Sequence, residues 1–460
     1  MSDYQLLVIG AGPGGYTAAL RAARLGLHTA IVERREVGGT CLNRGCIPTK
    51  TLLHASQVYH DAANGASVGV HGALSYDMGE MFAFKRSVSE KLRGGILSLL
   101  KSAKVDVLEG TAQITAPGQV SVTGADGTQT AYTAERILAA TGSVNVRPPI
   151  PGLDLPGVMT SDELLEGTDT PYASIVIIGG GVIGVEFATF YSHLGCRVTL
   201  VEGMANLLPQ LDRELGQNLA QILKKQGVEV LTSAMVRSLE QTGEGLCVHL
   251  EQKGKELTVT GEKVLCAIGR RAYFDGLFAP DLNPALNGKR LLVDEDYRTS
   301  IPGVYAIGDA SAAVQLAHVA AAQGTDCVER MCGSQGSTDM NVIPSCIYSA
   351  PEIAVVGLTE AEAKEQGIPA VSGKCTLFSN ARTIIEDPGR CFMKLVARSD
   401  TREIIGAQLM CQHASDMISQ LSTAMVNHLT ARQLLSVMRP HPSFEEALSE
   451  AVENLTAKLA

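Results

Sequence analysis

The sequence brings two thiols close together. Cys41 and Cys46 lie in the run Gly-Gly-Thr-Cys-Leu-Asn-Arg-Gly-Cys-Ile-Pro-Thr-Lys at residues 38–50. In a regular helix, residues at i and i+5 have Cα atoms roughly 8–9 Å apart, whereas a disulfide needs about 4.4–6.8 Å. An oxidised pair therefore excludes an ideal helix here; Gly45 supplies backbone freedom, and Pro48 disrupts the normal hydrogen-bond ladder. We interpret the pair as a redox-cycled disulfide; the alternative is two free buried thiols.

A glycine loop occurs twice, each time between an apolar run and a helical pattern. The copies are Gly10-Ala-Gly12-Pro-Gly-Gly15 and Gly179-Gly-Gly181-Val-Ile-Gly184. The first glycine permits a sharp turn, the second lets the backbone approach a pyrophosphate, and the third allows close packing of helix on strand. The helix N-terminus adds partial positive charge. Two such loops predict two dinucleotides, most simply a flavin and a nicotinamide.

An acidic residue follows each loop at the same interval. Glu33 ends Thr-Ala-Ile-Val-Glu and Glu202 ends Val-Thr-Leu-Val-Glu, each at the end of an expected strand. Such an acid binds a ribose hydroxyl, and at Glu202 it would repel the 2′-phosphate of NADP. NAD is therefore favoured over NADP. A further acid, Asp309, follows the apolar run before Gly308; we expect it to be exposed and to bind a sugar-alcohol hydroxyl, or to be an ordinary turn residue.

The length, composition and charge of the chain argue against several classes of protein. The chain has 460 residues, enough for about three domains, and a net charge of −10 without a basic block, which argues against a nucleic acid partner. We find no signal peptide pattern and no apolar stretch long enough for a membrane helix, and expect a soluble, cytoplasmic protein. Metal-ligand spacing is also missing, so no metal site is predicted. Nine further cysteines are expected to be small buried residues: Cys196, Cys247, Cys266, Cys327, Cys332, Cys346, Cys375, Cys391 and Cys411.

With these motifs, the chain resembles the flavin-dependent pyridine nucleotide–disulfide oxidoreductases over essentially its whole length. The resemblance implies FAD and NAD as cofactors. It extends to Ala140-Thr141-Gly142, a short mid-chain motif, and to residues 299–309, a second flavin motif. It also assigns cofactor contacts to Gly269 and Ala317.

The implied fold class is α/β, with two Rossmann-like dinucleotide-binding domains and a C-terminal α+β interface domain. The FAD domain would span 1–146 and resume at 272–342. The NAD domain would span 147–271, and the interface (dimerisation) domain 343–460.

The resemblance also implies roles for individual side chains. Cys41 would exchange with substrate, and Cys46 would face the flavin. Lys50 would lie near the flavin, paired with Glu186. His441 would accept substrate protons and Glu446 would orient it, with both contributed by the neighbouring subunit of a homodimer.

The sequence departs from the family pattern at three positions. Arg439 stands where many relatives carry histidine, and Glu445 replaces a serine. Arg44 replaces a commonly apolar residue, where it could lower the thiol pKa values or shape the mouth of the substrate site.

The closest resemblance is to members that oxidise dihydrolipoamide on the lipoyl domains of a 2-oxo acid dehydrogenase or glycine cleavage complex. We therefore expect an NAD-dependent enzyme of that kind. One alternative is another NAD(P)H-dependent disulfide reductase, such as one acting on glutathione disulfide. A second alternative, from a different class, is a non-catalytic binding component.

Overall fold

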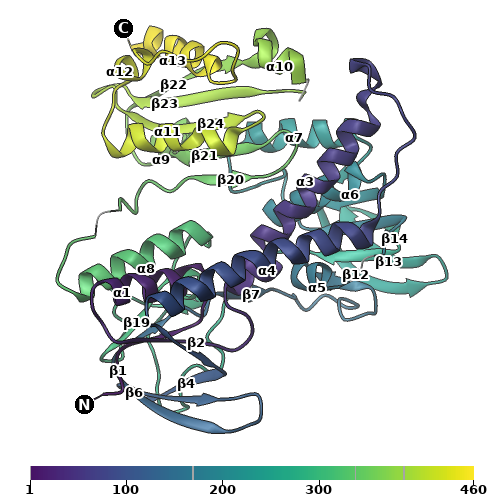
Figure 1. Ribbon diagram of the computed structural model, residues 1–460. Coiled ribbons are helices and arrows are strands. Elements are labelled where there is room, and N and C mark those ends of the chain that lie inside the picture. The colour runs from purple at the N-terminus through teal and green to yellow at the C-terminus, as the bar shows by residue number, and fades with distance from the viewer. Residues whose placement is uncertain (1, 168–169, 337, 387–388, 460) are drawn as a thin grey trace.

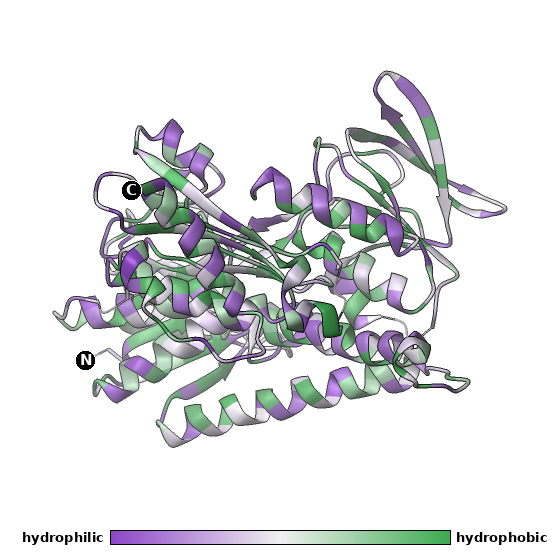
Figure 2. Cartoon of the chain, turned by 90° about the horizontal axis from the view of Figure 1, so that it is seen from above, coloured by the Kyte–Doolittle hydropathy of each residue, from purple (hydrophilic) through white to green (hydrophobic). Residues whose placement is uncertain are grey.

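The computed structural model describes residues 2–459 except 168–169, 337 and 387–388. Its three main sheets lie in separate parts of the molecule, with the first at the lower left of Figure 1, the second at the right and the third at the top. Figure 2 shows apolar residues along the central strands, whereas apolar and polar residues alternate along the outer helices. None of the described helices combines the length and the apolar character that a membrane span requires.

The first sheet carries the first glycine loop. Its strands run in the order β3-β2-β1-β6-β5-β4, and β19 also pairs with β6. The bounds are β1 (Tyr4–Ile9), β2 (Thr29–Glu33), β3 (Asp106–Glu109), β4 (Thr111–Ala116), β5 (Gln119–Thr123), β6 (Gln129–Ala139) and β19 (Val304–Ala306). Strand β1 is parallel to β2 and β6. Leu6, Leu7 and Val8 are fully buried, as expected for a parallel strand covered on both faces.

Helices cover this sheet and extend from it. They are α1 (Pro13–Arg24), α2 (Gly39–Arg44), α3 (Cys46–Ala63), the 3₁₀ turn η1 (Gly65–Val68), α4 (Met78–Ser102), the 3₁₀ turn η2 (Gly308–Ala310) and α8 (Ala317–Met331). Asp77 begins α4 by accepting a hydrogen bond from the Glu80 amide. Helices α1 and α8 touch along glycines, because a Cβ at Gly324 would lie 2.4 Å from the Gly14 carbonyl oxygen.

The second sheet carries the second glycine loop. It is fully parallel, in the order β11-β10-β9-β15-β8. Its strands are β8 (Val158–Thr160), β9 (Ser174–Ile178), β10 (Arg197–Val201), β11 (Glu229–Leu231) and β15 (Lys263–Cys266), with helices α5 (Ser161–Glu166), α6 (Val182–His193) and α7 (Arg213–Lys225). An antiparallel sheet of β12 (Ala234–Thr242), β13 (Gly245–Gln252) and β14 (Lys255–Gly261) extends from it.

A two-stranded ribbon links the first two regions. Strand β7 (Ser143–Asn145) pairs antiparallel with β16 (Arg270–Ala272), so the segment leaving the first sheet meets the segment returning to it. A second small ribbon is formed by β17 (Leu286–Asn287) and β18 (Arg290–Leu291).

The third sheet is antiparallel, in the order β20-β21-β24-β23-β22. Its strands are β20 (Ser345–Ile347), β21 (Ile353–Gly357), β22 (Ala370–Thr376), β23 (Phe392–Arg398) and β24 (Ile404–Met410). The helices around it are α9 (Glu360–Glu365), η3 (Leu377–Ser379), α10 (Ala381–Glu386), α11 (Ala414–Val426), α12 (Ala431–Leu435) and α13 (Glu446–Leu459). With two sheets that carry the glycine loops and this α+β region, the predicted fold class is confirmed.

Candidate active site

One cavity of about 1470 Å³ contacts both glycine loops and the thiol segment. This is more than the 300–1,000 Å³ of an ordinary small-ligand pocket, so it has room for more than one small ligand. It brings together most of the predicted site residues: Gly10, Gly12, Glu33, Cys41, Cys46, Lys50, Thr141, Gly142, Gly179, Gly181, Glu186, Glu202, Gly269, Gly308, Asp309 and Ala317. Gly15, Gly184, His441 and Glu446 do not line it.

The three glycines of the first loop have the different structural roles that the sequence predicts. A Cβ at Gly10 would lie 2.4 Å from the Ala140 carbonyl oxygen, and one at Gly15 would lie 1.8 Å from the Gly10 carbonyl oxygen. A Cβ at Gly12 would meet no atom within 4 Å, because it would point into open space. The first and third glycines therefore permit the fold, while the second leaves room for a ligand to approach the backbone. This is the cradle that a dinucleotide pyrophosphate requires.

The second loop repeats this arrangement. A Cβ at Gly179 would lie 2.4 Å from the Ala267 carbonyl oxygen, one at Gly184 would lie 1.8 Å from the Gly179 carbonyl oxygen, and one at Gly181 would meet nothing within 4 Å. The loop therefore fits a second dinucleotide in the same way.

The two acids also adopt matching positions. The Ala11 amide donates to the Glu33 carboxylate at 2.8 Å, and the Gly180 amide donates to the Glu202 carboxylate at 2.6 Å. Each carboxylate thus braces its own loop. Because a carboxylate oxygen has two lone pairs, both acids keep acceptor capacity toward a ribose hydroxyl.

The thiol segment is broken between its two cysteines. Helix α2 ends at Arg44, α3 begins at Cys46, and Gly45 lies between them with φ −144° and ψ −116°. A Cβ at Gly45 would lie 2.9 Å from the Thr40 carbonyl oxygen and 3.2 Å from the Cys41 Cα. The segment is therefore not a continuous helix, and the close packing at Gly45 excludes a side chain. Pro48 lies in the first turn of α3, where a missing amide hydrogen is tolerated.

The two thiols differ in acidity. A hydrogen bond to Cys46 raises the pKa of the Cys41 thiol, and burial adds to that shift. The same hydrogen bond lowers the pKa of Cys46 to about 7; burial opposes this shift, and the charge of Lys50 adds to it. Near neutral pH, Cys46 is therefore the sulfur with thiolate character and Cys41 the protonated one. This asymmetry suits one exchanging and one electron-donating sulfur.

An ion pair stands one turn beyond Cys46. Lys50 Nζ donates to both oxygens of Glu186, each at 2.8 Å, and the Glu186 side chain is only 4% exposed. The Tyr348 amide also donates to Glu186, at 3.1 Å, and its ring lies 4.6 Å from Lys50 Nζ. Burial opposes the Lys50 charge, but Glu186 outweighs it and raises the pKa of Lys50. The pairing predicted for Lys50 and Glu186 is present, and Tyr348 is a neighbour that sequence reasoning missed.

Asp309 differs from the sequence expectation of an exposed acid. It is half-buried and accepts a 2.6 Å hydrogen bond from the Ser143 hydroxyl, which in turn accepts from Arg270 at 2.9 Å. Burial raises the pKa of Asp309. The Thr141 hydroxyl similarly donates to the Tyr273 carbonyl. Because Ser143 and Arg270 belong to β7 and β16, the ribbon between the first two sheets orients this acid, and no local sequence signal reveals it.

His441 and Glu446 contact each other outside the cavity. The imidazole Nδ1 lies 2.8 Å from Glu446 Oε1, and the His441 side chain is 76% exposed. The Ser443 amide donates to the other Glu446 oxygen at 2.9 Å. That backbone hydrogen bond and the one to His441 lower the pKa of Glu446. The pair is thus formed within one chain, but it is not brought to the thiols of that same chain.

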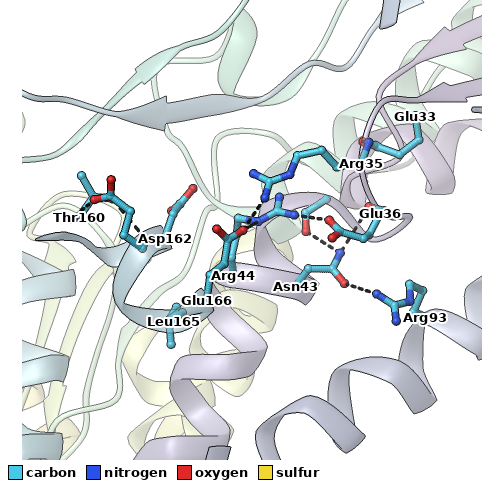
Figure 3. A network of polar contacts seen from close by, with 12 residues as sticks. Glu33, Arg35, Glu36, Asn43, Arg44, Arg93, Thr160, Asp162, Leu165 and Glu166 are labelled. Atoms are coloured by element: carbon cyan, nitrogen blue, oxygen red, sulfur yellow. Dashed lines mark hydrogen bonds and ion pairs between the residues drawn. The ribbon is translucent and has the colours of Figure 1, made fainter. Parts of the chain in front are cut away.

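The three unusual residues are explained by their contacts. Arg439 donates to the Ser449 hydroxyl at 2.8 Å, and Glu445 accepts from Gln420 at 3.0 Å. The Arg44 side chain, 6% exposed, is held by the carboxylates of Glu36 and Glu166 (Figure 3). Two carboxylates thus neutralise the Arg44 charge, and the cation that lowers the pKa of both thiols is Lys50.

The other cysteines are mostly sheltered. Five are buried, namely Cys266, Cys327, Cys375, Cys391 and Cys411, and Cys196, Cys247 and Cys346 are half-buried. Cys332 is exposed at the end of α8, so the prediction of burial is wrong there. Burial raises the pKa of seven of these thiols: Cys196, Cys266, Cys327, Cys346, Cys375, Cys391 and Cys411.

One group of side chains resembles a metal site in composition. Glu240, Cys247 and His249 on the β12–β13 hairpin place possible ligand atoms within 4.8 Å of one another, although the sequence predicts no such site. His249 Nε2 lies 3.1 Å from a Glu240 oxygen, an ordinary surface pair that accounts for the proximity.

Comparisons with known proteins agree with this geometry. Residues 4–324 match the family model described as pyridine nucleotide-disulphide oxidoreductase, and residues 343–452 match the dimerisation domain of that family. The chain is 37% identical to a dihydrolipoyl dehydrogenase of Bacillus subtilis, with 98% of this chain and 97% of the relative covered. It is also 37% identical to a dihydrolipoyl dehydrogenase of Geobacillus stearothermophilus, covering 98% and 96%.

Solved structures show the same architecture. LpdA from Mycobacterium tuberculosis superimposes with a TM-score of 0.90 at 27% identity, covering 98% of this chain and 99% of that one. The HOCl-induced flavoprotein disulfide reductase RclA from Escherichia coli, in its Cu(II) complex, gives a TM-score of 0.87 at 27% identity over the full length of both chains. With two nucleotide loops and a thiol pair around one cavity, the chain belongs to the pyridine nucleotide–disulphide oxidoreductase family.

Proposed function

We propose that this protein is a dihydrolipoyl dehydrogenase, which oxidises protein-bound dihydrolipoamide to lipoamide and reduces NAD⁺ to NADH. The observation that carries the proposal is the position of Cys46. Its acidic thiol shares one cavity with both nucleotide loops and lies one helical turn from the Lys50–Glu186 pair. The curated relatives from Bacillus subtilis and Geobacillus stearothermophilus bear the same enzyme name.

The family uses FAD and NAD(H), and the residues present fit both. The first loop with Glu33 and Asp309 would hold FAD, and the second loop with Glu202 would hold NAD. Bound FAD supplies the two-electron relay between a dithiol and NAD⁺. The side chains of this protein bind the reactants, orient them and move the protons.

His441 is suited to accept a proton from the substrate thiol. Glu446 accepts from Nδ1–H at 2.8 Å, which leaves Nε2 as the free basic atom. The low pKa of Glu446 keeps it anionic, so it stabilises the imidazolium that forms. Because the pair lies outside the cavity of its own chain, we assign it to the thiols of the partner subunit in a homodimer, as the dimerisation domain supports.

The thiol asymmetry then sets the direction of exchange. The substrate thiolate attacks the Cys41 sulfur of the Cys41–Cys46 disulfide, forming a mixed disulfide and releasing Cys46 as a thiolate. With a pKa of about 7, Cys46 is the better leaving group. The second substrate thiol then attacks the mixed disulfide, so that lipoamide closes its ring and Cys41 leaves as the reduced thiol.

The proposal includes partners and organisation. The substrate dithiol would be carried on lipoyl domains of a 2-oxo acid dehydrogenase or glycine cleavage complex. We place the protein in the cytoplasm, where it would meet these complexes and the NAD⁺ pool. We also propose domain limits of 1–146, 147–271, 272–342 and 343–460, since the three sheets fall within them.

The deciding experiment is a substrate panel on the purified, flavin-loaded protein. We expect NADH formation from dihydrolipoamide and NAD⁺, and little oxidation of NADPH by glutathione disulfide. A preference for the second pair would replace the substrate assignment with a glutathione-reductase-like one. A colourless protein that cannot be loaded with flavin would favour a binding component.

Subunit mixing tests the shared site. Cys46→Ser and His441→Gln should each abolish nearly all turnover. If equal amounts are unfolded and reassembled together, half of the dimers are mixed and each has one intact site. About a quarter of the parent activity should therefore return. Return of none, with dimers verified, would show that each chain uses its own histidine.

A further inference from the structure

We propose that Arg44 and Glu166 form an inter-domain latch that positions the thiol segment relative to the NAD-binding region during turnover. This inference rests on the proposed function, because the step it affects is electron transfer to NAD⁺. Both are positioning residues, and neither is assigned a contact with the reacting atoms.

Arg44 belongs to the thiol segment. It is the last residue of α2 and lies two residues before Cys46. Its side chain is 6% exposed, and its Nε donates to Glu166 Oε1 at 2.7 Å, while a terminal nitrogen contacts Glu36. Figure 3 shows the guanidinium between the two carboxylates. A charge this deeply placed depends on its partners, because burial makes an uncompensated guanidinium costly.

Glu166 lies in the second domain. It is the last residue of α5, which directly follows β8 at the edge of the second sheet. A capping box between Thr160 and Glu163 fixes the start of this short helix. Arg147 and Arg270 hold its other two acids, Glu163 at 2.6 Å and Asp162 at 3.0 Å. Glu166 is thus presented by an element held firmly to the second domain.

Two further contacts join the first domain to the end of α5. Arg35 donates to the same Glu166 oxygen at 2.6 Å, and Lys85 of α4 donates to the Leu165 carbonyl. The end of α5 therefore receives three cationic side chains from the first domain. Because Glu166 is 43% exposed, each ion pair is weakened by solvent, and the group restrains domain orientation more than it adds to stability.

The latch lies next to the reactive thiols in the sequence, so it can affect where Cys46 is held. In the described part of the chain, two ion pairs join the thiol segment to the second domain, Arg44 to Glu166 of α5 and Lys50 to Glu186 of α6. Cys46 lies between these two points. With both pairs intact, the sulfur has a fixed position relative to the second glycine loop; with one broken, the segment can pivot about the other.

The test compares two charge removals around the same arginine. Glu166→Gln removes the inter-domain partner, whereas Glu36→Gln removes the partner within the first domain and serves as the matched control. Both variants are prepared with flavin bound. Rapid mixing then separates flavin bleaching by dihydrolipoamide from reoxidation by NAD⁺, with dithiothreitol as a second reductant.

We expect Glu166→Gln to slow reoxidation by NAD⁺ about fivefold, since small misplacements of reacting groups cost rate, and to leave bleaching within twofold. Glu36→Gln should leave both steps within about twofold, and Arg44→Met should reproduce the Glu166→Gln pattern. Equal effects of the two glutamine variants, or no slowing in Glu166→Gln, would overturn the latch. If the parent is bleached by dithiothreitol but not by dihydrolipoamide, the proposed function fails, while the latch is still tested by NAD⁺ reoxidation.

Discussion

The two glycine loops have nearly the same geometry, yet different segments are attached to them. In each, the carbonyl of the residue after the first glycine accepts a hydrogen bond from a segment downstream of the acid. The Gly38 amide donates to Ala11 at 2.8 Å in the first loop, and the Leu208 amide donates to Gly180 at 2.9 Å in the second. The attached segments differ, because Gly38 leads into the thiol helices and Leu208 leads into α7. Two glycine loops of nearly the same geometry therefore differ in chemistry, because a segment that carries two thiols is attached to only one of them.

The loops also differ in how tightly they are covered. In the first, Gly14 lies against α8, where a Cβ would be 2.9 Å from the Ala320 carbonyl oxygen. The equivalent residue of the second loop is Ile183, a half-buried side chain that lines the cavity. Helix α8 thus packs directly on the first loop, whereas the second loop carries a larger side chain at the same position; both loops line the cavity.

The sharpest test of this contrast is to substitute the first glycine of each loop. Gly10→Ala and Gly179→Ala each place a Cβ 2.4 Å from a carbonyl oxygen, at φ values of +101° and +112°. We expect Gly10→Ala to purify without flavin and without activity. Gly179→Ala should stay yellow, with KM for NAD⁺ raised about tenfold or more, because distorting the loop by 1–3 kcal/mol weakens one ligand only. Loss of flavin in both variants would erase the distinction.

Glu202→Gln tests the acid of the second loop. Its carboxylate should discriminate against the 2′-phosphate of NADP by charge. We expect the ratio of kcat/KM for NAD⁺ to that for NADP⁺ to fall about tenfold, a change of about 1.4 kcal/mol. Glu33→Gln, at the matching position of the first loop, should leave this ratio unchanged. A ratio that moves with Glu33 and not with Glu202 would reverse the assignment of nucleotides to loops.

Gly324→Ala tests the closure over the first loop. The new Cβ would lie 2.4 Å from the Gly14 carbonyl oxygen and force α8 away from α1. We expect a loss of about 2 kcal/mol in the free energy of unfolding, with faster release of flavin, measured by thermal unfolding and by dilution. Gly95→Ala on α4, where a Cβ meets nothing within 4 Å, is the control and should be neutral or slightly stabilising. Flavin release at the parent rate would contradict the closure.

The smallest expected effect concerns the acidity of Cys46, which Lys50→Met should shift in a pH profile. The Lys50 charge favours the thiolate of Cys46, whose pKa is about 7. Without that charge the pKa rises, and Glu186, left unpaired, acts in the same direction. Alkylation of Cys46 in the reduced protein should therefore need a higher pH, as followed by mass spectrometry. Lys101→Met, far along α4, should leave the midpoint in place, and a fall in the Lys50→Met midpoint would contradict this account.

What the sequence could predict depends on distance along the chain. The glycine loops, their acids and the break at Gly45 are local patterns, and the structure contains each of them. The five-residue spacing of His441 and Glu446 is also local. The Lys50–Glu186 contact joins residues 136 apart, and only the resemblance suggested it.

Contacts between distant segments were missed. Asp309 accepts from a residue 166 positions away, and Arg44 donates to one 122 positions away. Such pairs depend on how two sheets dock, which periodicity and spacing do not encode. The partners of Arg44 and the partial burial of Asp309 share this cause, because each side chain finds a partner on another domain or on the ribbon between domains.

The sheltering of the remaining sulfurs has a chemical consequence. Seven of the nine cysteines outside the redox pair are held in the protonated form by burial. Electrophiles and peroxides react with thiolates, so damage is directed toward the sulfur at the cavity. An electrophile would therefore react with Cys46 and with the exposed Cys332 before it reached the seven sheltered thiols, and reaction at Cys46 would abolish NAD⁺-dependent turnover.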